Sequence, residues 1–215
     1  MMRSTFAALA AVMTLSVAAA QQPAASAAVQ AQQGPGELIE EKAQQMLDEL
    51  NKNRVAYKKD PAKVRALVDR VLLPHFDTQY SARLVLGRHW RTANPQQRER
   101  FIQAFYNSLL DNYGSALTEF TGERLRVFPT KVAPEADQAT VRTEVKRDNG
   151  TRVPVNYRMR KTPEGWKAWD VSIEGISYVK SFREDFGAEI DRKGLDAVIR
   201  RLESGDRPRT PASRA

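Results

Sequence analysis

Three residues of this 215-residue chain have the types and positions that acid–base catalysis could use. His75 and Asp77 lie two positions apart, directly after Pro74, and Asp170 lies in a stretch of alternating apolar residues nearer the C-terminus. An imidazole beside a carboxylate can transfer protons near neutral pH. The chain has only two histidines, however, and its sequence has no nucleophile elbow and no metal-ligand spacing. By its place in the alternation, Asp170 would point to the solvated face of a strand. Together these features disfavour an enzyme and a metal site.

The absence of cysteine from the sequence excludes disulfide bonds, a thiolate nucleophile and a cysteine-ligated metal. Residues 1–20 contain one arginine, then an apolar run, then three alanines, which is the pattern of a secretory signal peptide. Cleavage after Ala20 and cleavage after Ala27 fit the small-residue rule about equally well. The run is shorter than the ~20 residues that span a bilayer. We therefore expect an exported, freely soluble mature protein without a lipid anchor.

Composition divides the remainder into three parts. Residues 21–36 are rich in Ala, Gln and Pro and predict a disordered leader, residues 205–215 predict a disordered basic tail, and 37–204 have the size of a single domain. The net charge of +8 falls to +7 when Arg3 is removed with the signal. This balance indicates an anionic lipid or an acidic protein as partner, or simply a basic solvated surface. Nucleic acid is disfavoured, because the protein is exported and its cations are dispersed.

The first half of the domain has helical periodicity and helix punctuation. We expect helices at Glu37–Leu50, Asp60–Leu73 and Thr78–Gly87, followed by a long helix that starts at Pro95 and fades near Gly122. Asn94 has the position of an N-cap for the long helix. Its inward face repeats large apolar residues every four positions: Phe101, Phe105, Leu109, Tyr113 and Leu117.

From Leu125 to Ile173 the period changes to two. The alternating residues all have odd numbers: Leu125, Val127, Val141, Thr143, Val145, Val153, Val155, Tyr157, Met159, Trp169, Val171 and Ile173. Opposed residues of an antiparallel pair share a face, so their numbers must have an even sum if apolar residues are to meet. A three-residue loop at Asp148–Gly150 satisfies this rule and predicts the pairs Val145 with Val153, Thr143 with Val155, and Val141 with Tyr157. A second loop at Pro163–Gly165 predicts Met159 with Trp169, Tyr157 with Val171, and Val155 with Ile173. The other face would be basic through Arg142, Lys146, Arg152, Arg158 and Lys167.

After Gly175 the period becomes helical again, with a helix to about Arg192 and a last one at Leu195–Leu202. These elements predict an α+β fold, in which helices pack on one face of a four-stranded antiparallel sheet. Long aromatic residues from two helices and from the sheet leave room for an apolar cavity between the layers.

Two blocks of residues carry a resemblance to a known family. They are Leu73-Pro74, Asp77, Leu86-Gly87, Trp90-Arg91, Gln97, Phe101, Phe105 and Tyr113, and then Val171–Ser177, Phe182-Arg183, Phe186 and Gly194-Leu195. In order and spacing the chain from Leu38 to Leu202 resembles the MlaC family, the periplasmic lipid-shuttle or toluene-tolerance component of the bacterial Mla lipid-asymmetry system. His89 and Phe182 stand where such sequences more usually have tyrosine.

This resemblance implies a function without a catalytic residue or a cofactor. The space between sheet and helices would hold the acyl chains of a phospholipid as cargo, in a periplasmic shuttle between an outer-membrane lipoprotein–porin complex and an inner-membrane ABC transporter with a substrate-binding ring. Burying about thirty methylenes at ~0.8 kcal/mol each explains why a closed pocket is needed. We expect the pocket to be lined by Leu86, Phe105, Leu109, Tyr113, Tyr157, Met159, Trp169, Val171, Ile173, Tyr178 and Phe182.

Two other interpretations remain open at this point. One is a small α+β cavity enzyme that uses His75 and Asp77. The other is a protein-only periplasmic adaptor with a fully packed core and no ligand. The sequence does not give the headgroup preference, the number of acyl chains, the direction of transport or the oligomeric state.

Overall fold

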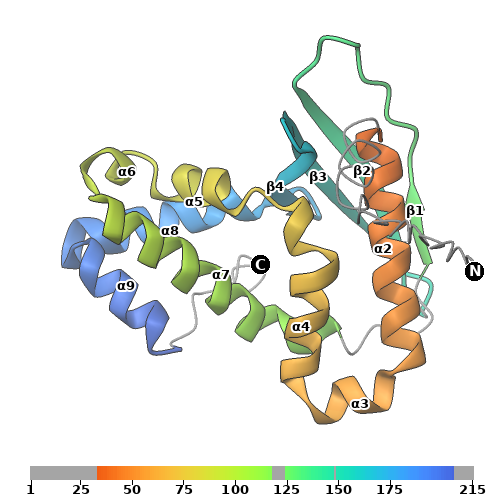
Figure 1. The fold of residues 1–215 in the computed structure, drawn as a ribbon, viewed down its shortest axis with the longest axis horizontal. Helices are drawn as coiled ribbons and strands as arrows, with labels where there is room; N and C mark the ends of the chain where they lie inside the picture. Colours follow the sequence, from red (N-terminus) through yellow and green to blue (C-terminus); the bar gives the residue numbers. More distant parts are fainter. Residues whose placement is uncertain (1–32, 118–123, 148, 206–215) are drawn as a thin grey trace, which may run out of the picture.

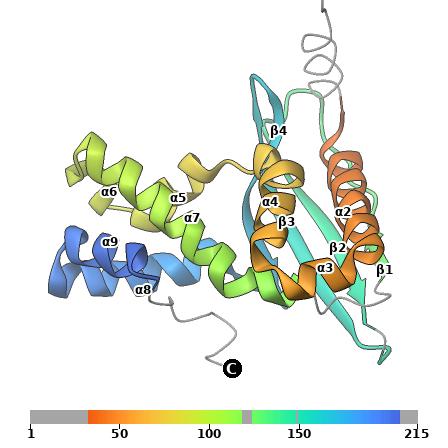
Figure 2. The ribbon, with the colours of Figure 1, turned by 60° about the horizontal axis from the view of Figure 1, so that its bottom comes forward.

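A computed structural model of the chain describes residues 33–117, 124–147 and 149–205. Figures 1 and 2 show two parts: an antiparallel sheet crossed by α2 and α4, and a group of helices, α5 to α9, to its side. The signal peptide, most of the leader and the tail beyond Gly205 lie outside the described residues, so those assignments stay predictions. No described helix is both long enough and apolar enough to cross a membrane.

Three helices lie over the sheet and form a cluster of their own. They are α2 (Pro35–Lys52), α3 (Arg54–Lys59) and α4 (Pro61–Val71). The Asp60 side chain accepts a hydrogen bond from the Ala62 N–H at 3.1 Å and so caps α4. Helix α2 starts at Pro35, so the leader predicted to extend to residue 36 ends earlier, because proline is well suited to a first turn. The buried residues of this cluster are Met46, Leu50, Tyr57, Val64, Leu67, Val68 and Val71.

The side group of helices follows a short 3₁₀ turn, η1 (Leu73–His75). It comprises α5 (Thr78–Leu86), α6 (His89–Thr92), α7 (Pro95–Leu117), α8 (Tyr178–Lys193) and α9 (Leu195–Glu203). The predicted cap of α7 is confirmed, since the Asn94 side chain accepts from the Gln97 N–H at 2.8 Å and the Gln97 side chain accepts from the Asn94 N–H at 3.0 Å. The predicted extension of α7 toward Gly122 falls on residues that the structure does not describe.

Four phenylalanines form the centre of this helical group, which we call the bundle core. Phe105 packs edge-on against Phe182 at a ring-centroid distance of 5.2 Å and against Phe186 at 5.7 Å. Phe101 stacks on Phe105 at 5.6 Å. Pairs at these distances add to the apolar burial of the rings. The other buried members are Ala82, Val85, Leu86, Ala104, Ile190, Val198, Ile199 and Leu202.

The sheet is antiparallel throughout and has the strand order β1-β2-β3-β4-β5. Its strands are β1 (Arg124–Val127), β2 (Gln138–Lys146), β3 (Arg152–Thr162), β4 (Gly165–Ile173) and β5 (Ile176–Ser177). The predicted α+β class is confirmed, but the sheet has five strands where four were expected. The additional strand β5 has only two residues and follows a tight turn at Glu174-Gly175, where both residues have positive φ.

The β2–β3 register agrees with the prediction, with Val145 opposite Val153 and Val141 opposite Tyr157. The β3–β4 register agrees only at one end, where Tyr157 faces Val171 and Val155 faces Ile173.

At the other end of β3–β4, the predicted pair of Met159 with Trp169 is wrong. The register shifts between Arg158 and Met159, so that Arg158 faces Asp170 while Met159 faces Ala168. Trp169 is the extra residue of this β-bulge, and Pro163-Glu164 forms a two-residue turn between Thr162 and Gly165. A bulge restores the apolar alternation that a two-residue turn would otherwise invert.

The bulge defines the two faces of the sheet. We call the face toward α2 the inner face; it carries the odd-numbered apolar residues of β1–β3, then Val171 and Ile173, and beyond the bulge Ala168 and Trp166. The opposite, outer face carries the exposed cations Arg142, Lys146, Arg152 and Arg158, as predicted, and the half-buried Lys167. Asp170 has the outer register, but it is 1% exposed and not solvated, because the start of α8 covers it.

Candidate functional site

One end of the inner face is closed by α2. Leu38 and Ile39 from the first turns of this helix pack on Val141, Met159 and Trp166, and all five side chains are buried. Val141 and Met159 have no exposed surface at all. This part of the interlayer is an ordinary protein core with no room for a ligand.

The rest of the inner face is buried less evenly: Val153 and Val155 are buried, whereas other side chains are not. Six of its apolar side chains keep accessible surface although they point between the layers: Leu125, Val127, Val145, Tyr157, Val171 and Ile173. Tyr157 and Val171 are directly opposed across β3 and β4, and Ile173 lies two positions further along β4. We call these six residues the apolar strip. They come from β1 to β4, and the buried Thr143, Val153 and Val155 of the same face lie between some of them.

Tyr157 is the one ionisable residue of the apolar strip. Burial raises the pKa of its hydroxyl to about 12, because an enclosed phenolate loses its hydration. Within the described part of the chain no hydrogen-bond partner is seen for this hydroxyl. The ring is thus largely enclosed by protein, while part of its surface remains accessible.

The polar side chains around the apolar strip are satisfied by the backbone. The Thr143 hydroxyl, 1% exposed, donates to the Val155 carbonyl at 2.7 Å. The Ser108 hydroxyl on α7 donates to the Phe105 carbonyl at 2.7 Å. A buried polar group with its hydrogen bond made adds little polarity to its surroundings. The Thr143 hydroxyl therefore adds little polarity to the inner face.

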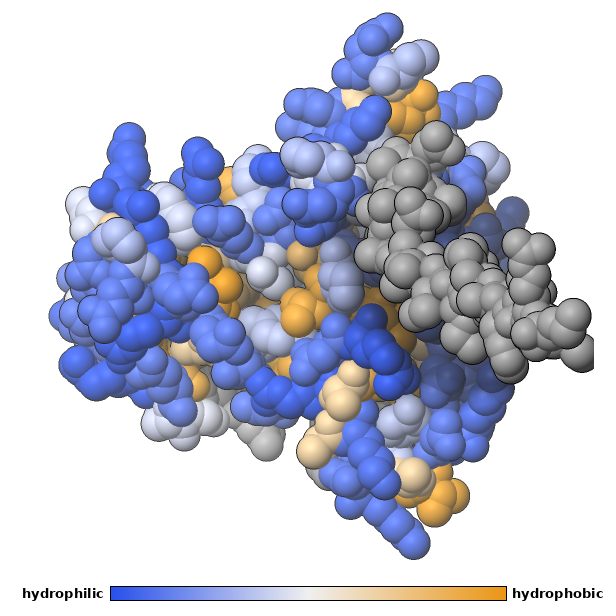
Figure 3. Space-filling view, viewed as in Figure 1, coloured by the Kyte–Doolittle hydropathy of each residue, from blue (hydrophilic) through white to orange (hydrophobic). Residues whose placement is uncertain are grey.

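Helices α4 and α7 provide the wall beside α2, and polar contacts at their exposed edge join them. The Tyr106 hydroxyl donates to Asp69 at 2.6 Å, and Arg65 forms an ion pair with Asp111 at 3.4 Å. Burial and, next, the hydrogen bond to Asp69 raise the pKa of Tyr106. Leu72 and Leu110 pack against the α2–α4 cluster and remain partly accessible. Figure 3 shows hydrophobic side chains in the recessed centre of this face, around α4, with hydrophilic residues around them.

The structure does not bring the eleven predicted pocket residues together. Tyr157, Val171 and Ile173 lie side by side in the apolar strip. Met159 shares their face but lies in the closed core under α2. The remaining residues belong to other places: Leu86, Phe105 and Phe182 are in the bundle core, Leu109 and Tyr178 pack on its edge, and Trp169 lies on the outer side. The Tyr113 side chain is outside the described part.

Trp169 is turned away by the bulge. Its ring is edge-on to Tyr80 of α5 at 5.7 Å, and the guanidinium of Arg158, an outer-face residue, lies 5.6 Å from its centroid. The pocket prediction also omitted Leu125, Val127 and Val145. Their odd numbers were the signal that placed them on the same face as Tyr157.

The acid–base candidates have structural partners. Asp77 accepts a hydrogen bond from the Tyr80 N–H at 2.9 Å as the N-cap of α5, and it forms an ion pair with Arg160 at 3.2 Å. Burial and, next, the positive charge of Lys42 lower the pKa of His75, which disfavours its protonation. Asp170 binds Ser177 and the Val179 N–H. Among the described residues, no three His, Asp or Glu side chains gather in a geometry that could hold a metal.

Comparison with known proteins gives consistent relatives. The family described as MlaC protein matches residues 40–204. The toluene tolerance protein ttg2D of Pseudomonas putida is 31% identical over 77% of this chain and 77% of its own. The intermembrane phospholipid transport system binding protein MlaC of Haemophilus influenzae is 23% identical over 80% of this chain and 82% of its own.

A solved structure has the same fold. It is the phospholipid-binding protein from Ralstonia solanacearum in complex with a phospholipid, with a TM-score of 0.74 and 24% identity. The match covers 79% of this chain and 94% of that one. The match therefore includes nearly the whole length of that neighbour.

Proposed function

The chain belongs to the MlaC family, and from this premise we propose that it is a soluble periplasmic phospholipid carrier. The acyl chains would occupy the space between the apolar strip and helices α4 and α7, with the headgroup at the surface. Two observations support this assignment. One relative is named as a binding protein of an intermembrane phospholipid transport system, and the solved neighbour is in complex with a phospholipid.

The observation that carries the proposal is the uneven burial of the inner face. Val141 and Met159 are fully buried under α2, whereas Tyr157, Val171 and Ile173 on the same face keep accessible surface. Each Å² of apolar surface that stays accessible forgoes the free energy of about 25 cal/mol that its burial would contribute. A ligand with long hydrocarbon chains would recover this free energy on binding.

The same energetics explain why the carrier would act while docked. A diacyl phospholipid has about thirty methylenes, each worth ~0.8 kcal/mol on leaving water, so release into solution is negligible. The affinity of the apolar strip for acyl chains must be close to that of the bilayer interior. A much higher affinity would stall unloading. Loading and unloading would therefore take place on membrane complexes: by family resemblance, an outer-membrane lipoprotein–porin complex and an inner-membrane ABC transporter.

Export to the periplasm would follow from cleavage of the predicted signal peptide at residue 20 or 27. The exposed cations of the outer face, such as Arg142 and Lys146, would favour approach to acidic surfaces, since a cation near an anionic membrane contributes about 1 kcal/mol. Chemistry on the lipid is not part of the proposal, because the carboxylates of Asp77 and Asp170 are held by structural hydrogen bonds.

A transfer experiment tests the carrier function. The mature protein is loaded from vesicles that contain isotope-labelled phosphatidylglycerol, re-isolated, and mixed either with membranes of its own bacterium or with liposomes of the same lipids. Faster delivery to the native membranes, with the difference abolished by protease treatment of those membranes, is expected of a docked carrier. Equal delivery to both would contradict docking, and failure to take up any lipid would contradict the carrier itself.

A further inference from the structure

One edge of the sheet is unoccupied for half of its length. Strand β2 has nine residues, but β1 pairs only with Thr143–Lys146, and the last contact of that ladder is the Phe128 N–H to the Arg142 carbonyl at 2.9 Å. Beyond it, residues 138–141 pair with β3 alone. After Pro129 the connection leaves the line of β1, so it does not continue the ladder.

The direction of the free backbone groups follows from the register. In an antiparallel sheet, successive residues bond alternately to the neighbour on one side and the neighbour on the other. Because the Arg142 carbonyl faces β1, the N–H and C=O groups of Gln138 and Thr140 face the same edge, away from β3. No backbone partner for these groups is seen among the described residues.

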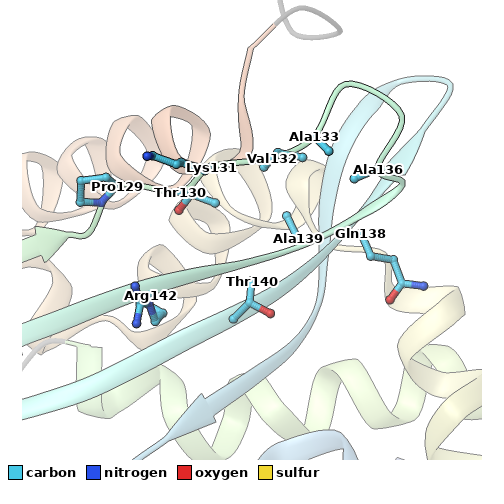
Figure 4. A pocket seen from close by; sticks show the side chains of 10 residues that line it. All are labelled: Pro129, Thr130, Lys131, Val132, Ala133, Ala136, Gln138, Ala139, Thr140 and Arg142. Carbon is cyan, nitrogen blue, oxygen red and sulfur yellow. The ribbon is translucent and has the colours of Figure 1, made fainter.

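A hollow of about 490 Å³ lies along this edge. Figure 4 shows it between β2 and the connection from β1, with Lys131 on the connection and Arg142 on β2. It is lined by Pro129, Thr130, Lys131, Val132, Ala133, Ala136, Gln138, Ala139, Thr140 and Arg142. The lining includes two cations and no carboxylate. Glu135 and Asp137, the carboxylates of the connection, do not line it.

We propose that this edge binds an extended acidic segment of a partner protein by β-strand addition, in line with β1. Exposed strand edges accept extended peptides through main-chain hydrogen bonds, and natural proteins usually protect edges that are not used in this way. The free part of β2 is about 14 Å long at ~3.4 Å per residue, which fits four residues of the partner. Lys131 and Arg142 would pair with its acidic side chains.

The chemistry of the site favours a polypeptide over a membrane. A phospholipid headgroup offers no alternating donors and acceptors to match the Gln138 and Thr140 backbone, and the hollow presents no large apolar side chain for insertion into a bilayer. Positive charge extends from the hollow across the outer face, where Arg126, Lys146 and Arg158 are exposed and form no ion pair with a described residue. Such a field accelerates and orients acidic partners. This edge is separate from the apolar strip, and its function does not depend on bound lipid.

Two substitutions at one residue test the backbone interaction. Thr140→Pro removes an N–H that faces the hollow and leaves the β2–β3 ladder intact, while Thr140→Ala removes the side chain and keeps the N–H. The probe is a labelled octapeptide of alternating valine and glutamate, with the glutamine version as a charge control. Binding is followed by fluorescence anisotropy on the mature protein, together with the exchange rate of the Gln138 amide.

We expect the wild type and Thr140→Ala to bind the peptide with the same affinity. In both, bound peptide should slow the hydrogen exchange of the Gln138 amide at least tenfold. Thr140→Pro should bind the peptide at least tenfold more weakly. The charge-reversed variant Lys131→Glu/Arg142→Glu, which keeps the backbone edge, should lose the preference for the glutamate peptide. Equal binding by the proline and alanine variants would overturn the inference. So would displacement of the peptide by anionic phosphatidylglycerol vesicles but not by neutral ones. Lipid retention, measured on the same samples, reports the carrier function separately.

Discussion

The carboxylate of Asp170 on β4 accepts a hydrogen bond of 2.6 Å from the hydroxyl of Ser177, the last residue of the sheet. It accepts a second one from the Val179 N–H at 3.0 Å. Ser177 also caps α8 by accepting from the Lys180 N–H at 3.1 Å. Asp170 thus fastens the edge of the sheet to the first turn of α8, where the helix dipole favours a negative charge.

We predict that Asp170→Ala lowers the free energy of unfolding by about 2–4 kcal/mol, because two hydrogen bonds to a buried charge are lost together. Ser177→Ala should cost about 1–2 kcal/mol through the lost cap and the lost donor. Urea unfolding of the two variants and of the double variant measures the coupling between the residues. Strictly additive losses would contradict the paired arrangement.

Charge on the inner face should remove the bound lipid. Val171→Lys introduces an ammonium into the apolar strip, and we expect lipid occupancy to fall about tenfold or more, since a charge is costly in an apolar pocket. The matched control Thr140→Lys, on the exposed outer face of the same sheet, should retain its lipid. Circular dichroism verifies that both variants fold. Equal occupancy in the two would place the lipid away from the strip.

The enclosed hydroxyl of Tyr157 predicts a loss of stability at high pH. Its folded-state pKa of about 12 lies above the ordinary tyrosine value of 10.0, so the folded protein holds the proton more tightly. Its contribution is complete below pH 10 and is lost as the pH rises from 10 to 12, by up to about 1.4 kcal/mol per pH unit. Tyr157→Phe should remove this slope and leave stability near pH 7 unchanged. Urea midpoints at pH 9 and 11 measure the difference.

The opposite sign is expected for Glu189 on α8. Burial raises the pKa of its carboxyl, but hydrogen bonds of 3.0 and 2.7 Å from Arg201, together with the charges of Arg201 and Lys193, outweigh burial and lower it. The stabilisation is complete above the ordinary glutamate pKa of 4.5 and is lost as the pH falls through the lowered pKa.

Glu189→Gln should therefore cost about 1–2 kcal/mol at pH 7 and much less at pH 3. The control is Glu203→Gln. Glu203 is exposed and pairs with Arg100 at 2.7 Å, so its substitution should lower the stability less. A Glu189→Gln cost that is independent of pH would contradict the proposed ion pair.

Local rules predicted much of this fold because they act within a few residues. The Asn94 cap of α7, the end of α5 at Gly87, and the odd-numbered inner face of β2 and β3 all follow from such rules. The bulge at Trp169 could not be predicted, because parity is compatible with both a three-residue loop and a two-residue turn followed by a bulge. Packing of Tyr80 against Trp169 is consistent only with the second arrangement.

The pocket prediction combined two kinds of aromatic and aliphatic residue. Phe105 and Phe182 have the size and spacing of ligand contacts, yet they pack on each other in the bundle core. Tyr157 and Val171 differ from them in what lies opposite, which depends on how the helices pack beside the sheet. Such helix–sheet distances are set by tertiary packing and leave no signal in a single sequence.

The most direct test of the central claim is native mass spectrometry of the mature protein purified from its own cells, followed by organic extraction. We predict a stoichiometric diacyl phospholipid in the wild type and its loss in Val171→Lys. A ligand-free wild-type protein that also refuses added phospholipid would contradict the carrier function and favour a protein-only adaptor.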